Sequence, residues 1–527
     1  MATRAWWQDA VIYQIYPRSF MDSSGDGIGD LKGVAQKLDY LAWLGIDTIW
    51  ISPFYTSPMV DFGYDISNYR DVDPVFGTLG DFDALLEAVH AKGMKLILDF
   101  VPNHTSDQHP WFREARASCT SPKRDWYIWR DGKGSAPPNN WLSMFGGSAW
   151  EYDPSTDQYY YHAFLKEQPD LNWANPAVVA EMLDTLRFWF ERGIDGVRID
   201  VIWQLAKDAQ FRDEPLNPAW QAGDDPYHRL DHIHSCDQPE VHALIRQMRS
   251  ALAPFGEKLL IGEVYLPLPR VVAYYGADGR SGLNLPFNFH LLTTPWTASA
   301  IADLICRYEA LLPPGAWPNW VLGNHDRTRL ASRIGKAQAR VAAMLLLTLR
   351  GTPTLYYGDE LGLEDVTIPP ALVQDPWEKN VPGLGLGRDP VRTPMPWTPD
   401  AVGGFTTGTP WLPLNGDIAA CNVEMERSDP RSLLNLYHQL LALRRAHPAL
   451  SAGEVHHVRA EGDVLVFERH EAAERLTIAL NLSGAPATLP LHGWVLLSTA
   501  ARSPVPDAVS SLTLAPNEGV ILRHIAF

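Results

Sequence analysis

The most constraining feature of the sequence is a repeated alternation between short apolar runs and longer amphipathic runs. Eight runs rich in β-branched or aromatic residues are expected to be strands, and most precede a stretch with apolar residues at helical spacing. Such alternation favours parallel strands, in a closed eight-fold barrel or a doubly wound sheet. Eight units favour the (β/α)8 TIM barrel, an α/β fold. The expected strands are Val11–Tyr16, Thr48–Ser52, Lys95–Val101, Gly196–Val201, Lys258–Val264, Leu283–Phe289, Trp320–Gly323 and Thr354–Tyr357.

Two interruptions and a late change of character divide this pattern. Residues 104–176 are rich in Trp, Tyr, Asn, Pro and Gly and lack helical periodicity, which predicts a subdomain inserted after the third strand. A Pro- and Gly-rich excursion, Glu360–Pro430, separates the last strand from the last helix. From residue 452 short alternating strands predict a C-terminal antiparallel β-sandwich. The expected domains are a barrel of residues 1–103 and 177–451, the insertion 104–176, and the β domain 452–527.

Charge and composition restrict the partners. The formal net charge of −18 repels phosphate backbones and anionic lipid headgroups, so neither nucleic acid nor membrane is expected as a partner. A neutral small molecule such as a sugar suits this surface. The 20 Trp and 19 Tyr agree, because aromatic faces stack on sugar rings, although most of these side chains are expected to pack in the core.

Cysteine spacing and hydropathy indicate the compartment. The four cysteines lie far apart and form no CxxC pair, which argues against a disulfide framework or a zinc site. No run of 18 apolar residues occurs, and the N-terminal stretch lacks the apolar core of a signal peptide. We therefore expect a soluble, cytoplasmic protein.

Three acidic residues lie at the C-terminal ends of expected strands, where barrel enzymes carry their catalytic groups. They are Asp200 in GVRIDV, Glu263 in LIGEVY and Asp326 in VLGNHDR. Arg198 precedes Asp200 by two residues, so both side chains share one strand face, and a guanidinium there is expected to lower the pKa of Asp200 and keep it ionised. Glu263 ends an apolar strand, where partial burial favours a protonated carboxyl. Such a pair has the composition needed for glycoside cleavage, in which one carboxylate attacks and one acid releases the leaving oxygen.

Two histidines accompany these acids at strand ends. His104 closes the run DFVPNH that starts at Asp99, and His325 precedes Asp326. Each histidine alone is more often structural, but together with the acids they could hold sugar hydroxyls in a fixed geometry.

The segments DFVPNH, GVRID, GEVY and NHD, in this order, resemble the four signature regions of the α-amylase family of glycoside hydrolases (glycoside hydrolase family 13). The similarity extends over essentially the whole chain. Two further segments, DFGYDIS (Asp61–Ser67) and RTPMPW (Arg392–Trp397), are similar to the α-glucosidase and oligo-1,6-glucosidase branch.

This resemblance implies a retaining, two-step reaction on terminal α-glucosides that needs no catalytic cofactor. According to this resemblance, Asp200 would be the nucleophile, Glu263 the general acid/base and Asp326 a transition-state stabiliser. Arg198, His104 and His325 would surround the reacting sugar, with Asp99 in support, and Tyr64 would stack beneath it. Asp61 and Arg392 match a pair that grips the non-reducing end, which implies exo action. Val201 resembles the residue of α-1,6-preferring members, and activity on both linkages is expected.

A separate motif, DSSGDGIGD, resembles an EF-hand ligand ladder. Asp22, Ser24, Asp26, Ile28 and Asp30 fall at loop positions 1, 3, 5, 7 and 9, but position 12 is Gly33 where the EF-hand has Glu. The family often carries Ca²⁺ or Mg²⁺ here, so a structural ion is expected, the alternative being an Asp- and Gly-rich turn.

Other hypotheses stay open at this stage. A transglucosylase or sugar isomerase of the same family would share every catalytic residue, and a non-catalytic relative would lack an acid or carry a membrane anchor. The histidines at 228, 232, 234 and 242 offer only one facing pair, so zinc is not expected there. GLGLGR at 383–388 follows no strand and does not predict a nucleotide site.

Overall fold

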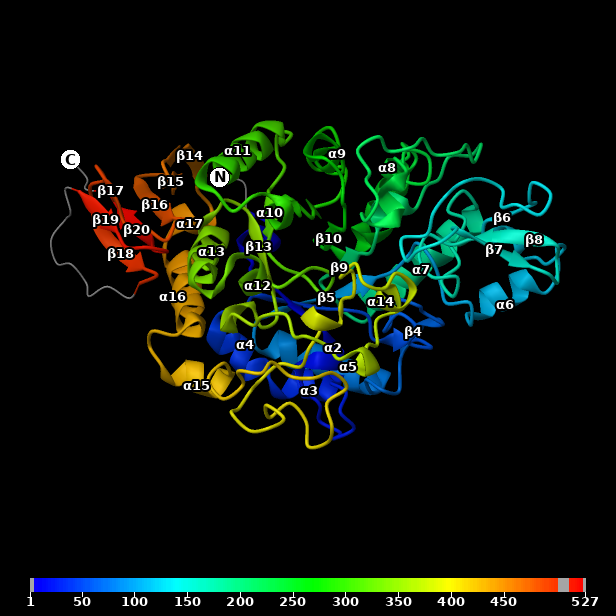
Figure 1. Cartoon of the computed structure of the whole chain (residues 1–527), viewed down its shortest axis with the longest axis horizontal. Coiled ribbons are helices and arrows are strands. Elements are labelled where there is room, and N and C mark those ends of the chain that lie inside the picture. The colour runs from blue at the N-terminus through cyan, green and yellow to red at the C-terminus, as the bar shows by residue number, and fades with distance from the viewer. Residues whose placement is uncertain (1–3, 501–510, 525–527) are drawn as a thin grey trace.

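The core of the molecule is an eight-stranded parallel sheet, seen in a computed structural model that describes residues 4–500 and 511–524 (Figure 1). Its strands run in the order β11-β10-β9-β5-β2-β1-β13-β12. All eight expected strands are present, and the barrel prediction is confirmed. They are β1 (Ile12–Ile15), β2 (Thr48–Ile51), β5 (Lys95–Phe100), β9 (Gly196–Ile199), β10 (Leu259–Gly262), β11 (Leu285–Pro286), β12 (Asn319–Val321) and β13 (Thr352–Tyr356).

The seam between the first and last strands of this order is bridged by a side chain. Asn319, at the start of β12, donates from its amide to the carbonyl of Pro286 in β11. Its amide oxygen accepts the backbone N–H of Asn288 at 2.9 Å. The fully buried Asn319 thus joins two strands that share no backbone ladder.

Helices cover the outside of the barrel, and polar side chains cap the first turns of several of them. Thr78 caps α5 in a capping box with Asp81, Asn175 caps α7 ahead of a proline, and Thr297 caps α11. The covering helices are α3 (Leu31–Gln36), α4 (Leu38–Leu44), α5 (Leu79–Ala91), α7 (Pro176–Glu191), α8 (Val241–Leu252), α11 (Ala298–Leu311), α13 (Lys336–Thr348) and α16 (Leu433–Ala446). Shorter elements are α1 (Trp6–Asp9), α2 (Pro17–Phe20), β3 (Tyr55–Thr56), β4 (Asn68–Val72), α9 (Leu268–Ala273), α10 (His290–Thr293), α12 (Leu330–Ile334), α14 (Pro376–Asn380), α15 (Val423–Ser428) and α17 (Pro448–Ser451).

The inserted segment 104–176 contains a small sheet of its own. Strands β6 (Trp129–Arg130), β8 (Gln158–Tyr161) and β7 (Trp150–Asp153) pair antiparallel, and α6 (Pro110–Arg116) accompanies them. This sheet lies at one end of the molecule, shown in cyan, and the C-terminal strands lie at the other (Figure 1).

The C-terminal strands form two antiparallel sheets. One has the order β14-β15-β16-β20-β18 and the other pairs β17 with β19, and a shared apolar cluster that includes Val464, Leu489, Leu512 and Leu522 joins them. The strands are β14 (Glu454–Glu461), β15 (Val464–Glu471), β16 (Glu474–Asn481), β17 (Ala487–Leu489), β18 (Trp494–Ser498), β19 (Leu512–Leu514) and β20 (Gly519–Arg523). Residues 1–3, 501–510 and 525–527 of the expected domains lie outside the described residues, and the domain boundaries stay a prediction.

No helix within residues 4–500 and 511–524 combines the length and apolar character needed to cross a bilayer.

Candidate active site

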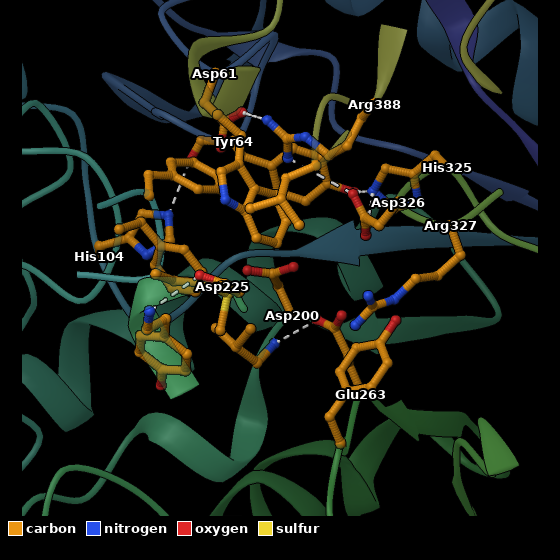
Figure 2. Close-up of a pocket in the computed structure, with 18 of the residues that line it drawn as sticks. Asp61, Tyr64, His104, Asp200, Asp225, Glu263, His325, Asp326, Arg327 and Arg388 are labelled. Carbon is orange, nitrogen blue, oxygen red and sulfur yellow. Dashed lines mark hydrogen bonds and ion pairs between the residues drawn. The ribbon is translucent and has the colours of Figure 1, made fainter. Parts of the chain in front are cut away.

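A cavity of about 300 Å³ lies where the barrel strands end at their carboxyl termini. Asp200 follows β9 directly and Glu263 follows β10 directly, so neighbouring strands deliver both carboxyls to the same cavity (Figure 2). Asp326 arrives from the turn after β12, and the inserted segment and the excursion after β13 complete the wall. The lining residues are Asp61, Tyr64, His104, Met144, Phe145, Phe164, Asp200, Val201, Trp203, Asp225, Tyr227, His228, Glu263, Tyr265, His325, Asp326, Arg327, Trp377, Leu386 and Arg388.

Beneath the cavity, Arg198 connects three carboxylates. Its Nη1 lies 2.6 Å from Asp200 Oδ1 and 2.8 Å from Asp99 Oδ1, and its Nη2 lies 2.8 Å from Glu263 Oε2. The predicted shared strand face of Arg198 and Asp200 is therefore present. The structure also gives Asp99, expected only in a supporting position, a direct place in this cluster.

The protonation of the cluster differs from the expectation. Burial raises the pKa of Asp200 well above its ordinary value; Arg198 opposes the rise, and the carboxylates of Glu263 and Asp99 add to it. Burial likewise raises the pKa of Asp99 to about 6, again against Arg198. The prediction that Arg198 leaves Asp200 with a lowered pKa is wrong, because one guanidinium shared among three carboxylates does not offset their loss of water. The cluster therefore retains a proton in mildly acidic solution.

Glu263 is held by the backbone immediately after the predicted nucleophile. Its Oε2 accepts the N–H of Val201 at 2.9 Å, and Val201 adopts left-handed angles, φ 34° and ψ 44°. A β-branched residue in this region is strained, by roughly 1–3 kcal/mol, and such strain gathers at functional sites. Within the described part of the chain, Oε2 alone of the two Glu263 oxygens is engaged in a bond. Oε1 is thus left for a ligand in the cavity.

Asp326 lies among three cationic or polar groups. Arg392 Nη2 contacts its Oδ1 at 2.9 Å, Arg388 Nη1 lies 3.6 Å from the same oxygen, and His325 Nε2 lies 3.3 Å from Oδ2. Although burial opposes ionisation, these neighbours hold the pKa of Asp326 well below its usual range. Burial lowers the pKa of His325, whose Nδ1 lies 2.7 Å from the Gln14 amide nitrogen. The site therefore presents a fixed carboxylate beside a neutral imidazole.

Tyr64 and the two predicted histidines form one connected wall. The Tyr64 ring stacks on His325 with centroids 5.4 Å apart and planes 5° from parallel, and its hydroxyl lies 3.1 Å from Asp99 Oδ2. His104 Nε2 lies 3.2 Å from the Tyr64 carbonyl and 3.2 Å from the Gln168 amide. Burial lowers the pKa of His104 to about 4, so this imidazole is neutral near pH 7.

Asp61 lies at the opposite end of the cavity from Asp200 and Glu263, and its partner is Arg388 (Figure 2). Arg388 Nη2 contacts Asp61 Oδ1 at 2.6 Å, and the Gln168 amide donates to Oδ2 at 3.1 Å. The predicted pairing of Asp61 with Arg392 is wrong. Arg392 follows a further turn of the chain and is fully buried, where its Nε donates to the His325 carbonyl at 2.9 Å.

The comparisons with known proteins fit this geometry. The model of the α-amylase catalytic domain matches residues 14–453. The chain belongs to the α-amylase family. A probable α-glucosidase of Rhizobium meliloti is 42% identical, with 93% of this chain and 94% of that protein covered. An oligo-1,6-glucosidase of Parageobacillus thermoglucosidasius is 37% identical, with 94% of each covered. The solved structure of an α-glucosyl transfer enzyme is 42% identical with a TM-score of 0.93, covering 99% of this chain and 100% of that one.

Several cavity residues of this α-amylase-family chain were missed by sequence reasoning. Arg388 lies in GLGLGR, which was considered only as a nucleotide motif. Its position four residues before Arg392 was a signal that either arginine could reach the cavity. Trp203, Tyr265 and Arg327 lie within three residues of Asp200, Glu263 and Asp326, and this proximity was an available signal. The others lie on long segments without regular periodicity, so no pattern places them at the cavity. They are Met144, Phe145, Phe164, Asp225, Tyr227, His228, Trp377 and Leu386.

The predicted metal loop after β1 is folded around its own backbone. Asp22 accepts from the N–H groups of Gly25 and Gly27, each at 2.8 Å, and from the Thr406 hydroxyl at 2.5 Å. Asp30 caps α3 through the Gly33 N–H at 2.7 Å. Within residues 4–500 and 511–524 no three or more His, Cys, Asp or Glu side chains gather in a metal-binding group, at this loop or at the histidines around 228–242. The oxygen donors suit a hard cation in kind, and the ion stays a prediction.

Proposed function

We propose that this protein is a retaining exo-α-glucosidase that releases terminal α-D-glucose from short oligosaccharides or α-glucosides. One observation carries the proposal: two carboxyls on adjacent barrel strands face a cavity whose far end is closed by the Asp61–Arg388 ion pair (Figure 2). Two carboxyls are the machinery of glycoside cleavage, and a cavity ended by a charged pair suits the last sugar of a chain. The similarity to a probable α-glucosidase and an oligo-1,6-glucosidase supports it.

In the first step Asp200 attacks the anomeric carbon and forms a β-glucosyl ester, while Glu263 gives its proton to the departing glycosidic oxygen. Arg198 contacts both carboxyls and fixes their separation. In the second step Glu263 takes a proton from water, which attacks the same carbon and frees Asp200. Glucose leaves with its α configuration retained.

Asp326 stabilises the positive charge that develops on the ring in both steps. It is ionised, since its pKa is held low by His325, Arg392 and Arg388 against the effect of burial. Tyr64 offers a ring face to the sugar, and the neutral His104 and His325 can both accept and donate hydrogen bonds to hydroxyls. Each group therefore favours an uncharged, hydroxyl-rich ligand.

Cellular location and the structural ion belong to the proposal as well. The cysteines at 119, 236, 306 and 421 are all free, which supports a reducing compartment, and we place the enzyme in the cytoplasm. We also retain a structural Ca²⁺ or Mg²⁺ at residues 22–30, supported by the hard oxygen donors of that loop. No catalytic step uses it.

The configuration of the first product tests the mechanism. Proton NMR of a maltose or 4-nitrophenyl α-glucoside digest should show α-glucose first, followed by slow mutarotation to the β anomer. An initial β anomer would exclude the double displacement. Absence of any turnover, with Asp200→Ala indistinguishable from wild type, would instead support a non-catalytic relative.

A dedicated glucosyltransferase is the second candidate, and the similarity to a solved α-glucosyl transfer enzyme favours it. A hydroxyl acceptor would then replace water on the same ester. Arg327 lies on the Glu263 side of the cavity (Figure 2), over the Tyr265 ring at 5.0 Å, and we infer that these two side chains meet such an acceptor. Product analysis at high acceptor concentration separates the two, because negligible transfer product removes this candidate.

A further inference from the structure

Two carboxylates, Asp61 and Asp375, fix the position of the Arg388 guanidinium at the end of the cavity away from Asp200. Its Nη2 is shared between Asp61 Oδ1 at 2.6 Å and Asp375 Oδ1 at 2.7 Å. Asp375 also accepts from Arg388 Nε at 3.0 Å and from the Arg388 backbone N–H at 2.5 Å. Asp375 thus holds the Nε–Nη2 edge of the guanidinium and the backbone of Arg388, while Nη2 also reaches Asp61 and Nη1 faces Asp326.

Asp375 is entirely buried and does not line the cavity itself. Arg388 is also buried, with the ring of Phe145 below its guanidinium at 4.9 Å. With Asp375 in place, Nη2 of Arg388 has two acidic partners, Asp375 and Asp61. Without that carboxylate, the guanidinium would be drawn only toward Asp61 and toward Asp326, whose Oδ1 lies 3.6 Å from Nη1.

The same contacts close a loop that forms part of the cavity wall. Asp389 Oδ2 accepts the backbone N–H of Asp375 at 2.9 Å, while Asp375 accepts that of Arg388. Asp375 also caps α14 through the Trp377 N–H at 3.2 Å. The loop 376–387, which brings Trp377 and Leu386 to the cavity, is therefore fastened at both ends.

We propose that Asp375 is a positioning residue for recognition of the hydroxyl at C4 of the terminal glucose. It acts through Arg388, because C4 lies across the ring from the anomeric carbon and Arg388 with Asp61 lies across the cavity from Asp200 and Glu263 (Figure 2). This inference rests on the proposed function, since it assumes a glucose ring seated in that orientation.

The test compares 4-nitrophenyl α-glucoside with its 4-deoxy analogue, in wild type and in Asp375→Asn. Asparagine keeps the shape and the helix cap and removes the charge that holds Arg388. Wild type should strongly prefer the glucoside by kcat/KM. In the variant that preference should fall about 10- to 100-fold, which is the effect expected from losing one hydrogen bond to a charged group. Only the glucoside has the C4 hydroxyl that Arg388 binds, so only its cleavage is weakened.

A double-mutant cycle separates positioning from general damage. If Asp375 acts through Arg388, adding Asp375→Asn to Arg388→Gln should leave the preference unchanged. Glu378→Gln is the matched control: Glu378 lies in the same loop and binds the N–H groups of Gly383 and Gly387 without touching Arg388. It should retain the wild-type preference. If Asp375→Asn does not fold, Asp375→Ser, which also keeps a capping oxygen, takes its place.

The outcomes are distinct. A wild type that cleaves neither substrate contradicts the proposed function. A wild type that cleaves both equally well does not recognise the C4 hydroxyl, which overturns the role of Asp375 and leaves the glucosidase activity intact. A wild type with the expected preference, and a variant that loses activity on both substrates by the same factor, overturns the role of Asp375 and leaves the proposed function intact. An equal further fall in the Arg388→Gln background also overturns it.

Discussion

Arg198 contacts three carboxylates, and the linked ionisation of two of them, Asp99 and Asp200, controls the acid side of the reaction. Its guanidinium touches Asp99, Asp200 and Glu263 within 2.8 Å. A nucleophile must be ionised, yet burial raises the pKa of Asp200, and the negative charge of Asp99 raises it further. Activity should therefore decline as the pH falls and the cluster takes up a proton.

Replacing Asp99 with Asn tests this coupling. Removal of the Asp99 charge lowers the pKa of Asp200, because a like charge is gone and Arg198 is shared by fewer carboxylates. The acid limb of the kcat/KM profile should move to lower pH by about one unit, even if the maximal rate falls. The profile is measured from pH 4 to 8 against wild type. An acid limb that stays in place or moves to higher pH would contradict the coupling.

The residues at strand ends were the predictable part of the site. Asp200 and Glu263 follow regular strands directly, so strand position alone brought them together. The choice of Arg392 over Arg388 failed because the two arginines are four residues apart on an irregular segment, where only tertiary contacts decide which one meets Asp61. The pKa of Asp200 could not be predicted because it depends on burial and on the carboxylates of Glu263 and Asp99, which come from other strands.

At the scale of elements, the eight barrel strands were predictable and their exact lengths were not. The expected strand Leu283–Phe289 is paired only at Leu285–Pro286, where the proline contributes no backbone donor. The barrel is instead completed there by the side chain of Asn319. A side-chain bridge of this kind leaves no periodic signal in the sequence.

The loop 22–30 carries a prediction at this scale. Asp26 accepts one bond in the loop, from the Ile28 N–H at 2.8 Å, so its loss should affect folding little. If the loop binds Ca²⁺, saturating calcium should raise the thermal unfolding midpoint of chelator-treated protein by roughly 2–4 °C, because the ion binds only the folded loop. Asp26→Ala should abolish that rise. Equal thermal unfolding midpoints for the wild-type protein with and without calcium would contradict a Ca²⁺ site in this loop.

At the scale of the whole molecule, the barrel places residues from distant segments around one cavity. The inserted segment supplies Phe145 and Phe164, and the excursion after β13 supplies Trp377 and Arg388. The C-terminal sheets lie at the other end of the molecule and contribute no residue to the cavity (Figure 1). Alternating strands and helices were enough to predict the barrel. That the inserted segment and the excursion after β13 meet at the same cavity could be learned only from the structure.

The central claim, that Asp200 is the nucleophile and Glu263 the acid/base, is tested most directly by trapping the glucosyl ester. Glu263→Gln should lose about 10²- to 10⁴-fold in hydrolysis of natural sugars, yet still be glucosylated by a 5-fluoro-glucosyl fluoride, whose leaving group needs no proton. Mass spectrometry of a digest should place the sugar on the peptide that contains Asp200, and the added Asp200→Asn change should prevent labelling. A label on the Asp326 peptide, or none on the folded Glu263→Gln protein, would contradict the account.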